Sequence, residues 1–264
     1  MATVTTQAWV DYYNKLSALD EEATKKVADF ITSIRGFSYN NPNDMRRLVN
    51  YAYLVSNTYG EAAAAWACEM YDACGLASGL LLEPAMPADP PEYGEVAKTV
   101  YGVAKNTGSA AILAQSVGLL VKKTAQKTTI DNAKRDDAQI AFICHGDTCA
   151  YCIALSSKGW QDANNSDLEK DGEPSHLHGN CDCTYGVKFN DSLRYPFYKP
   201  EKYAKMYYGA DTGDEPATAK NRINAMRREF YKKNKDKIND QKKIAYERRK
   251  ELNSSKAEEY NIWF

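Results

Sequence analysis

The chain has 264 residues, of which 44% are hydrophobic and 26% charged, and its formal net charge is −1. This length suffices for one large domain or two ordinary ones. Seven cysteines are too few for a disulfide-dense secreted mini-domain, and because the number is odd they cannot all pair within one chain. No basic-then-apolar leader is present, and the most apolar stretch, residues 110–121, is shorter than the ~20 residues that cross a bilayer. We therefore expect a soluble protein that folds in a reducing cytoplasm and does not enter a membrane.

Residues 1–82 are expected to form a helical N-terminal region that opens with one amphipathic helix. Between Trp9 and Ile34 apolar residues recur mostly at intervals of three or four, with a break around Asp20. Gly36 follows this stretch and tolerates the left-handed conformation that ends many helices. The first helix is therefore predicted to end just before this glycine.

A second helix is predicted from an apolar stripe that runs at helical spacing through residues 48–70. Four consecutive alanines within it raise helix propensity and allow a neighbouring helix to approach closely. Asn43 or Asp44 is expected to cap its start by accepting hydrogen bonds from free backbone N–H groups. The helix is expected to end near Gly75 or Gly79, where the chain can turn away.

Residues 83–92 contain four prolines and are predicted to be an extended linker, which is the candidate hinge of the first half. Residues 93–141 are predicted to return to helix, with breaks near Gly108 and Gly118. Within this region, residues 122–139 alternate basic, threonine and acidic side chains, a pattern typical of the solvent-exposed face of a helix.

Residues 142–200 differ in character and are predicted to form a small zinc module. Five of the seven cysteines and all three histidines lie between Cys144 and Cys183. Zinc prefers four thiolate or imidazole ligands in a tetrahedron, and a Cys-x2-Cys turn with a second Cys/His segment suits that preference. A structural zinc ion would let this loop-rich segment fold, and residues 184–189 are expected to form a short strand. The candidate ligands are Cys149, Cys152, His178, Cys181 and Cys183.

The composition of this cluster leaves alternatives open. Cys181 and Cys183 are near-equal candidates for the fourth ligand, because both lie within reach of one ion. Cys144, His145 and His176 have weaker claims, and His145 is interpreted as a solvated loop residue. Disulfides, buried thiols without a metal, and catalytic thiol chemistry are the alternatives to zinc.

The sequence lacks several common catalytic motifs. It contains no phosphate-binding loop, no His-Glu-x2-His zinc protease helix and no Gly-x-Ser-x-Gly elbow. The string His176-x-His178-x-Asn180 is a short motif of the kind found in metal-dependent nucleases, and it keeps that class as an alternative. We expect a protein that is not an enzyme.

The C-terminal part of the chain is basic. From Lys220 onward there are 14 Lys and Arg against 7 Asp and Glu, whereas the preceding residues carry a net charge of −8. Residues 217–264 are predicted to form one long basic helix, as far as Leu252, followed by an apolar tag at residues 260–264. Paired cations on this helix would neutralise the phosphates of double-stranded DNA or contact an acidic protein surface. The alternative is a charged helix that is exposed to solvent and binds no partner. The tag is expected to dock into a groove of a partner.

The cysteine module resembles that of a known protein family. Residues 147–155 (DTCAYCIAL), Gly159 and residues 178–183 (HGNCDC) are similar to the minor head proteins of tailed bacteriophages, also called Mu F-like or head-morphogenesis proteins. That family shows Cys-x2-Cys-x2-Leu, then His-x2-Cys-x-Cys running into a Val/Phe strand, which Val187 and Phe189 match here.

The resemblance covers roughly residues 40–190, because the alanine-rich helix ending at residues 69–72 is also similar to the family's helical N-terminal region. Residues 158–174, which are acidic and polar, depart from the family pattern.

The resemblance implies a structural component of the phage head rather than an enzyme. It implies a minor capsid protein that is made in the host cytoplasm and joins the virion in several copies. Its expected partners are the portal or the major capsid protein and packaged double-stranded DNA. The alternatives are a zinc-containing nuclease and a nucleic-acid-binding protein. The predicted fold is mainly α, with a helical N-terminal region, a small zinc-stabilised α+β module and a long basic C-terminal helix.

Overall fold

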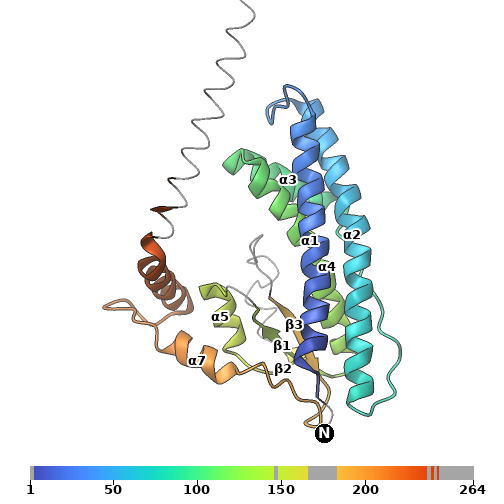
Figure 1. Ribbon diagram of the computed structural model, residues 1–264, viewed down its shortest axis with the longest axis vertical. Helices are drawn as coiled ribbons and strands as arrows, with labels where there is room; N and C mark the ends of the chain where they lie inside the picture. The colour runs from blue at the N-terminus through green and yellow to red at the C-terminus, as the bar shows by residue number, and fades with distance from the viewer. Residues whose placement is uncertain (1–2, 146–147, 166–182, 237–238, 241–242, 244–264) are drawn as a thin grey trace, which may run out of the picture. The chain divides into compact units, whose positions relative to one another are not determined.

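The structure is a computed structural model, and it describes residues 3–145, 148–165, 183–236, 239–240 and 243. The chain divides into two compact units, residues 1–206 and 207–264, which are treated separately below. The protein is mainly helical, as predicted, and the first unit also contains a small antiparallel sheet (Figure 1). Within the described residues, no helix combines the length and the apolar character that a membrane span requires.

Helix α1 (Thr6–Ser33) is one unbroken helix. Thr5 caps its start, because the Thr5 hydroxyl accepts a hydrogen bond from the Ala8 backbone N–H at 3.0 Å. The predicted break around Asp20 is wrong, since that carboxylate lies on the buried face of the helix and is paired with a lysine of another helix. Gly36 follows the helix end with a positive φ of 73°.

Helix α2 (Pro42–Ala77) spans 36 residues and starts slightly earlier than predicted. Asn41, and not Asn43 or Asp44, is the N-cap, and its side chain accepts a hydrogen bond from the Asn43 N–H. Pro42 then begins the helix, a position that suits proline because the backbone N–H that it lacks would have no partner there. The helix ends as predicted beside Gly79, whose φ of 72° only a residue without a Cβ adopts freely.

Residues 83–92, here called the proline strap, follow in an extended conformation and are hydrogen-bonded to the helices beside them. The Asn132 side chain accepts from the Met86 N–H at 2.8 Å and donates to the Met86 carbonyl oxygen at 2.7 Å. The Arg135 guanidinium donates to two successive strap carbonyl oxygens. The strap is therefore fixed to the end of a neighbouring helix, which argues against the predicted hinge.

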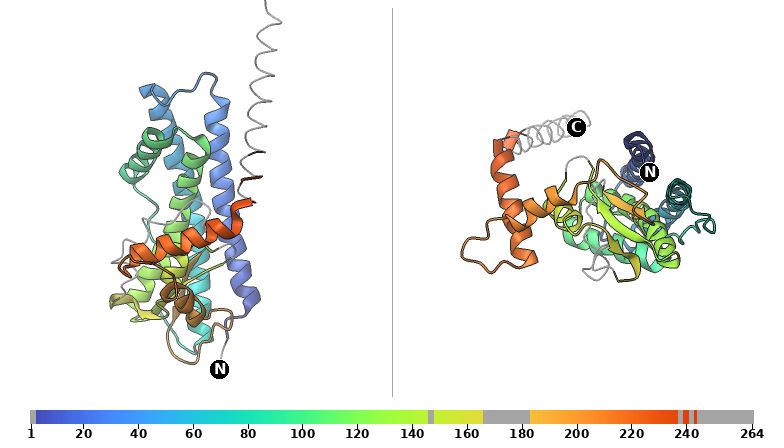
Figure 2. Two further views of the ribbon diagram at one scale, coloured as in Figure 1. Left: turned by 90° about the vertical axis from the view of Figure 1, so that its left-hand side faces the viewer. Right: turned by 90° about the horizontal axis from the view of Figure 1, so that it is seen from below.

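Helices α3 (Tyr93–Thr107) and α4 (Ala110–Arg135) are separated at Gly108, as predicted. The second predicted break, at Gly118, is wrong, because α4 continues through this residue and uses it to approach α1. Helix α4 packs against both α1 and α2, and the three run side by side in Figures 1 and 2. Helix α4 is consequently the central helix of the first unit.

The central position of α4 overturns the prediction that residues 122–139 form an exposed face. Six polar residues between positions 122 and 132 are buried between α1, α2, the proline strap and the sheet. Several threonines satisfy their hydroxyls by donating to the carbonyl four residues earlier, as Thr124 does to Leu120 and Thr128 to Thr124. The buried polar residues are Lys122, Thr124, Gln126, Thr128, Thr129 and Asn132.

The sheet has the strand order β2-β1-β3, and both pairings are antiparallel. The central pairing runs from Gln139 opposite Lys188 to Ile143 opposite Thr184. Strand β3 was predicted, whereas β1 begins inside the region predicted as helix. The strands are β1 (Gln139–Ile143), β2 (Gln161–Asp162) and β3 (Thr184–Lys188). The described residues also form helix α5 (Ala150–Ser156), the 3-10 helix η1 (Ala163–Asn165) and helix α7 (Pro200–Tyr208), whose last two residues belong to the second unit.

An aromatic cluster joins the start of α1 to the tyrosine-rich segment after the sheet. The Trp9 ring stacks on Phe197 with centroids 5.6 Å apart and meets the edge of Tyr195 at 6.0 Å. The Trp160 ring also packs on Tyr195, with centroids 4.9 Å apart. The two ends of the first unit are therefore packed together around one buried tyrosine.

In the second unit, residues 219–236 are helical. Thr218 caps this helix by accepting a hydrogen bond from the Asn221 N–H at 3.3 Å, so the helix starts two residues later than predicted. Its predicted continuation to Leu252, and the apolar tag at residues 260–264, lie almost entirely outside the described residues.

Candidate metal centre

Two cysteines flank the same end of the central strand pair. Cys144 directly follows β1, and Cys183 directly precedes β3. Because the ladder places Ile143 opposite Thr184, the next position in the same register places Cys144 opposite Cys183. The sheet therefore brings the backbones of two cysteines that are 39 positions apart in the sequence to the same end of the strand pair.

Helix α5 brings two further cysteines to this place. Cys149 is its N-cap, and its sulfur accepts a hydrogen bond from the Cys152 N–H at 3.4 Å. The Cys149 and Cys152 sulfurs lie 3.4 Å apart, and the Cys144 thiol donates to the Cys152 carbonyl oxygen at 3.3 Å. We call these four residues, Cys144, Cys149, Cys152 and Cys183, the cysteine corner.

Two tyrosines pack beside the cysteine corner and keep their protons at neutral pH. Tyr198 donates to the carbonyl oxygen of Ser156, the last residue of α5, at 2.9 Å, and burial raises its pKa. Tyr203 lies beside Cys144 and Cys183, and burial together with these thiols raises its pKa to about 12. Protonated tyrosine hydroxyls can donate hydrogen bonds to sulfur, so they stabilise thiolates better than apolar side chains would.

The structure places three of the five predicted ligands. Cys149 and Cys152 form a close pair, and Cys183 lies at the same corner, while His178 and Cys181 are outside the described residues. Among the residues that the structure describes, no group of three or more His, Cys, Asp or Glu side chains is close enough to hold a metal ion. The described residues thus provide a pair of thiols and a neighbouring cysteine rather than a complete site.

The thiol pair has a spacing that suits zinc. Two Zn–S bonds of about 2.3 Å at a tetrahedral angle place the sulfurs roughly 3.8 Å apart. The observed 3.4 Å between the Cys149 and Cys152 sulfurs differs from this by a small side-chain movement. The pair could therefore supply two of the four ligands that zinc requires.

Sequence reasoning underestimated two residues near the corner. Cys144 was given a weak claim, yet the β1–β3 register puts it opposite Cys183. His145 was interpreted as a solvated loop residue, but it is half-buried, with its ring centroid 3.6 Å from that of Tyr13. The signal that could have found Cys144 is the strand pairing itself, which was missed because residues 139–141, the first part of β1, were predicted as helix.

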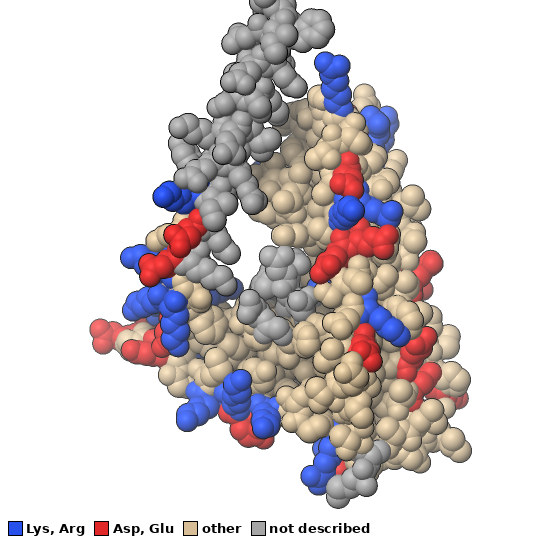
Figure 3. All heavy atoms as spheres, viewed as in Figure 1, with Lys and Arg blue, Asp and Glu red and all other residues tan. Residues whose placement is uncertain are grey.

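The second unit carries the basic surface. Residues 219–236 contain seven Lys and Arg and two acidic residues. The pairs Arg227-Arg228 and Lys232-Lys233 are exposed, and Figure 3 shows basic side chains along this helix on the visible face. In the first unit, by contrast, α1 and α2 carry charges of both signs in this view. The described part of the helix therefore has the charge that contact with phosphates needs.

Comparison with known proteins places the chain in a family. Searches of curated proteins and of solved structures gave no match. The family model described as VG15 protein matches residues 3–210, which include α1 to α7, the sheet and the cysteine corner. Because the match spans most of the sequence, the chain belongs to the VG15 protein family, a family of phage gene products.

Proposed function

We propose that this chain is a minor head protein of a tailed phage, a structural component of the virion that contacts the portal or the major capsid protein. Two observations support this role. The family match covers the helical unit and the cysteine corner. The observation that carries the proposal is that the Cys149 and Cys152 sulfurs lie 3.4 Å apart, because the Cys-x2-Cys segment carries the resemblance to head proteins.

In this proposal a structural zinc ion holds the module formed by residues 142–200. Cys149 and Cys152 would hold the ion from the start of α5, and Cys183, His178 and Cys181 are the candidates for the remaining positions. When bound, the ion would cross-link α5 to the segment that leads into β3. Because all four positions would come from the protein, the ion would leave no site for a substrate.

The basic helix gives this protein a proposed second partner. Exposed cation pairs within residues 219–236 would neutralise phosphates of packaged double-stranded DNA without reading its sequence. The protein would be made in the host cytoplasm and enter the head in several copies during assembly.

The virion role is tested by mass spectrometry of phage particles purified on a density gradient, with zinc measured on the same protein after native release. We expect the chain in the particles together with about one zinc ion per chain. Its absence from particles, with the protein found only in the lysate of infected cells, would refute the virion role.

Matched cysteine variants test the metal separately. Cys149→Ser should remove zinc from the purified protein, whereas Cys68→Ser, at a half-buried cysteine of α2, should leave the zinc content unchanged. Equal zinc contents in the two variants would refute the proposed ligand while leaving the virion role untouched.

Salt dependence tests the contact with DNA. Affinity for duplex DNA should fall steeply with added salt, by about 0.9 log units per log unit of salt for each phosphate contacted. The double variant R227E/R228E should lower both affinity and slope, whereas Lys98→Glu, at an exposed position of α3, should change neither. Affinity that is independent of ionic strength would refute the contact.

A further inference from the structure

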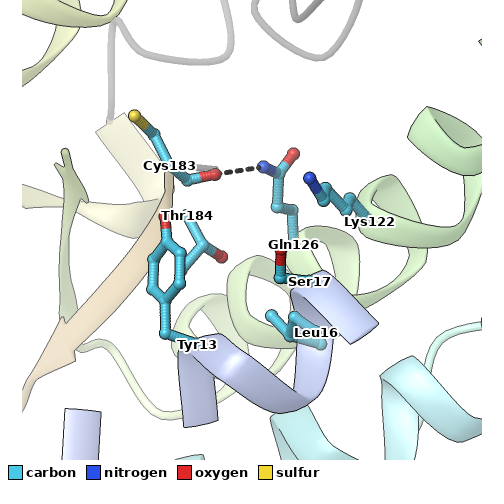
Figure 4. Close-up of a pocket in the computed structure, with 7 residues that line it drawn as sticks. All are labelled: Tyr13, Leu16, Ser17, Lys122, Gln126, Cys183 and Thr184. Atoms are coloured by element: carbon cyan, nitrogen blue, oxygen red, sulfur yellow. Dashed lines mark hydrogen bonds between the residues drawn. The ribbon is translucent and has the colours of Figure 1, made fainter. Parts of the chain in front are cut away.

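The enclosed pocket where α1, α4 and the start of β3 meet is too small for a partner molecule. It offers about 10 Å³ to the centre of a water molecule, which is near the ~10–15 Å³ that a single water needs. Figure 4 shows the Gln126 amide at this pocket, where it donates to the Cys183 carbonyl oxygen. The basic helix of the second unit, residues 219–236, instead presents an exposed charged surface.

One face of the basic helix is turned inward. Ala225 and Met226 are buried, at 2% and 3% exposure. The Arg222 guanidinium carbon lies 4.9 Å from the centroid of the Tyr208 ring, in a cation–π contact. Because successive residues are rotated by about 100°, Arg222, Ala225 and Met226 share one side of the helix. Tyr231 lies on the opposite side, which is therefore the outer face.

The outer face of the basic helix carries cations around an exposed aromatic ring. Tyr231 is 47% exposed. Four exposed Lys and Arg residues lie within roughly 60° of it around the helix axis. The two acidic residues of this helix, Glu229 and Asp236, lie about 140–160° away from it. We use the name basic stripe for Lys220, Arg227, Arg228, Tyr231 and Lys235.

A row of cations around an aromatic ring suits a single-stranded nucleic acid. The cations can neutralise phosphates along about 22 Å of helix, and the ring offers a flat face on which a base can stack. In duplex DNA the bases are stacked on one another and present only their edges in the grooves. The Tyr231 ring can therefore stack on a base only where a strand is unpaired.

We propose that the basic stripe binds single-stranded DNA, with the Tyr231 ring stacked on an unpaired base and the cations on the flanking phosphates. This inference rests on the proposed contact between the basic helix and DNA, and it adds an unpaired strand as a ligand of the same helix. The binding selects no particular sequence, because every base has a flat aromatic face.

Fluorescence anisotropy with the full chain separates stacking from phosphate contacts. The ligands are an oligothymidylate, a strand of the same length that lacks its bases, and a duplex. Tyr231→Ala should weaken binding of the oligothymidylate by about 5- to 140-fold and leave binding of the other two ligands unchanged. Tyr231→Phe keeps the ring and should bind like the wild type. Tyr101→Ala, at a half-exposed tyrosine of α3, is the matched control and should change nothing.

The outcomes distinguish the stacking from the DNA contact itself. If the wild type binds the oligothymidylate and the baseless strand equally, or if Tyr231→Ala weakens both equally, the stacking is overturned. Salt-dependent binding of duplex DNA would in that case still support the phosphate contact. If the chain binds none of the three ligands, the proposed DNA contact and this inference are both refuted.

Photo-cross-linking locates the stacked base. An iodouracil placed within the oligothymidylate becomes covalently attached, on irradiation, to an aromatic ring that stacks on it. Mass spectrometry of the digested adduct should find the cross-link on Tyr231. A cross-link confined to Tyr208 or to an aromatic residue of the first unit would overturn the assignment.

Discussion

Lys122 and Asp20 form a buried ion pair that joins the central helix α4 to α1. The Lys122 Nζ lies 2.6 Å from a carboxylate oxygen of Asp20, and the two side chains are 7% and 8% exposed. Two such charges lose most of their hydration on folding, so each depends on the other for compensation. This pair explains how an acidic residue lies on the inner face of α1 without interrupting it.

Removing one partner of this pair should destabilise the protein strongly. We expect Lys122→Met to lower the free energy of unfolding by about 3–5 kcal/mol, because it leaves the Asp20 carboxylate buried without its cation. Urea denaturation monitored by circular dichroism measures this. Lys26→Met removes an exposed pair with Glu22 and should change stability by less than about 0.5 kcal/mol. Similar losses in both variants would contradict the assigned role of burial.

Two glycines in helices provide a matched test of the contact between α1 and α4. A Cβ at Gly118 would overlap the side chains of Asp20 and Thr24 and lie 3.1 Å from the Asp20 carbonyl oxygen. Gly118→Ala should therefore destabilise the protein by about 1–3 kcal/mol despite its better helix propensity. Gly102→Ala meets nothing within 4 Å and should stabilise it by about 0.5–1 kcal/mol. If the two variants shift the midpoint of thermal unfolding in the same direction, α4 does not approach α1 this closely.

The proline strap should loosen when its central bond is removed. Asn132 is buried and makes two hydrogen bonds to the Met86 backbone. We expect Asn132→Leu to cost about 1–3 kcal/mol and to speed proteolytic cleavage within residues 83–92. Asn106→Leu, at an exposed position near the end of α3, is the control and should leave the cleavage rate unchanged. A strap that is cut equally fast in all three proteins would mean that these bonds do not hold it.

Acid should weaken the contact between Tyr71 and Asp136. The hydrogen bond from Arg135, supported by one from the Tyr71 hydroxyl at 2.9 Å, lowers the pKa of Asp136 below its ordinary value of 3.8. A carboxyl whose pKa is lowered by folding stabilises the protein above its unfolded pKa and loses that contribution as pH falls through the folded pKa. Wild type should therefore lose more stability than Asp136→Asn between pH 5 and pH 2, as urea denaturation across this range would show. Parallel pH profiles would contradict this assignment.

Metal removal should affect the cysteine module and spare the helices. If zinc holds residues 142–200, treatment with a strong chelator should speed proteolysis within this segment. The far-ultraviolet circular dichroism should change little, because α1, α2 and α4 bury their apolar faces against one another. An unchanged proteolysis pattern after complete chelation would argue that the module folds without metal.

Local signals predicted much of this fold. The apolar stripe of α2 and the glycines at positions 79 and 108 placed helices and their ends correctly, because capping and backbone freedom depend on a few adjacent residues. The β-branched and aromatic run at residues 184–188 likewise predicted strand β3. The spacing of Cys149 and Cys152 also placed two thiols together, since one turn of chain is enough to do so.

Other features were decided by contacts between distant segments. The start of β1 was predicted as the end of a helix, and only its pairing with β3 identifies it as a strand. That pairing also brings Cys144 and Cys183 to the same end of the sheet. Lys122 and its polar neighbours on α4 resemble a solvated face, because their partners on α1 and the proline strap lie tens of residues away in sequence. The sequence by itself determined where most helices begin and end, since those choices are local. Only the tertiary structure determined which polar residues are buried, because each needs a partner that the chain brings from elsewhere.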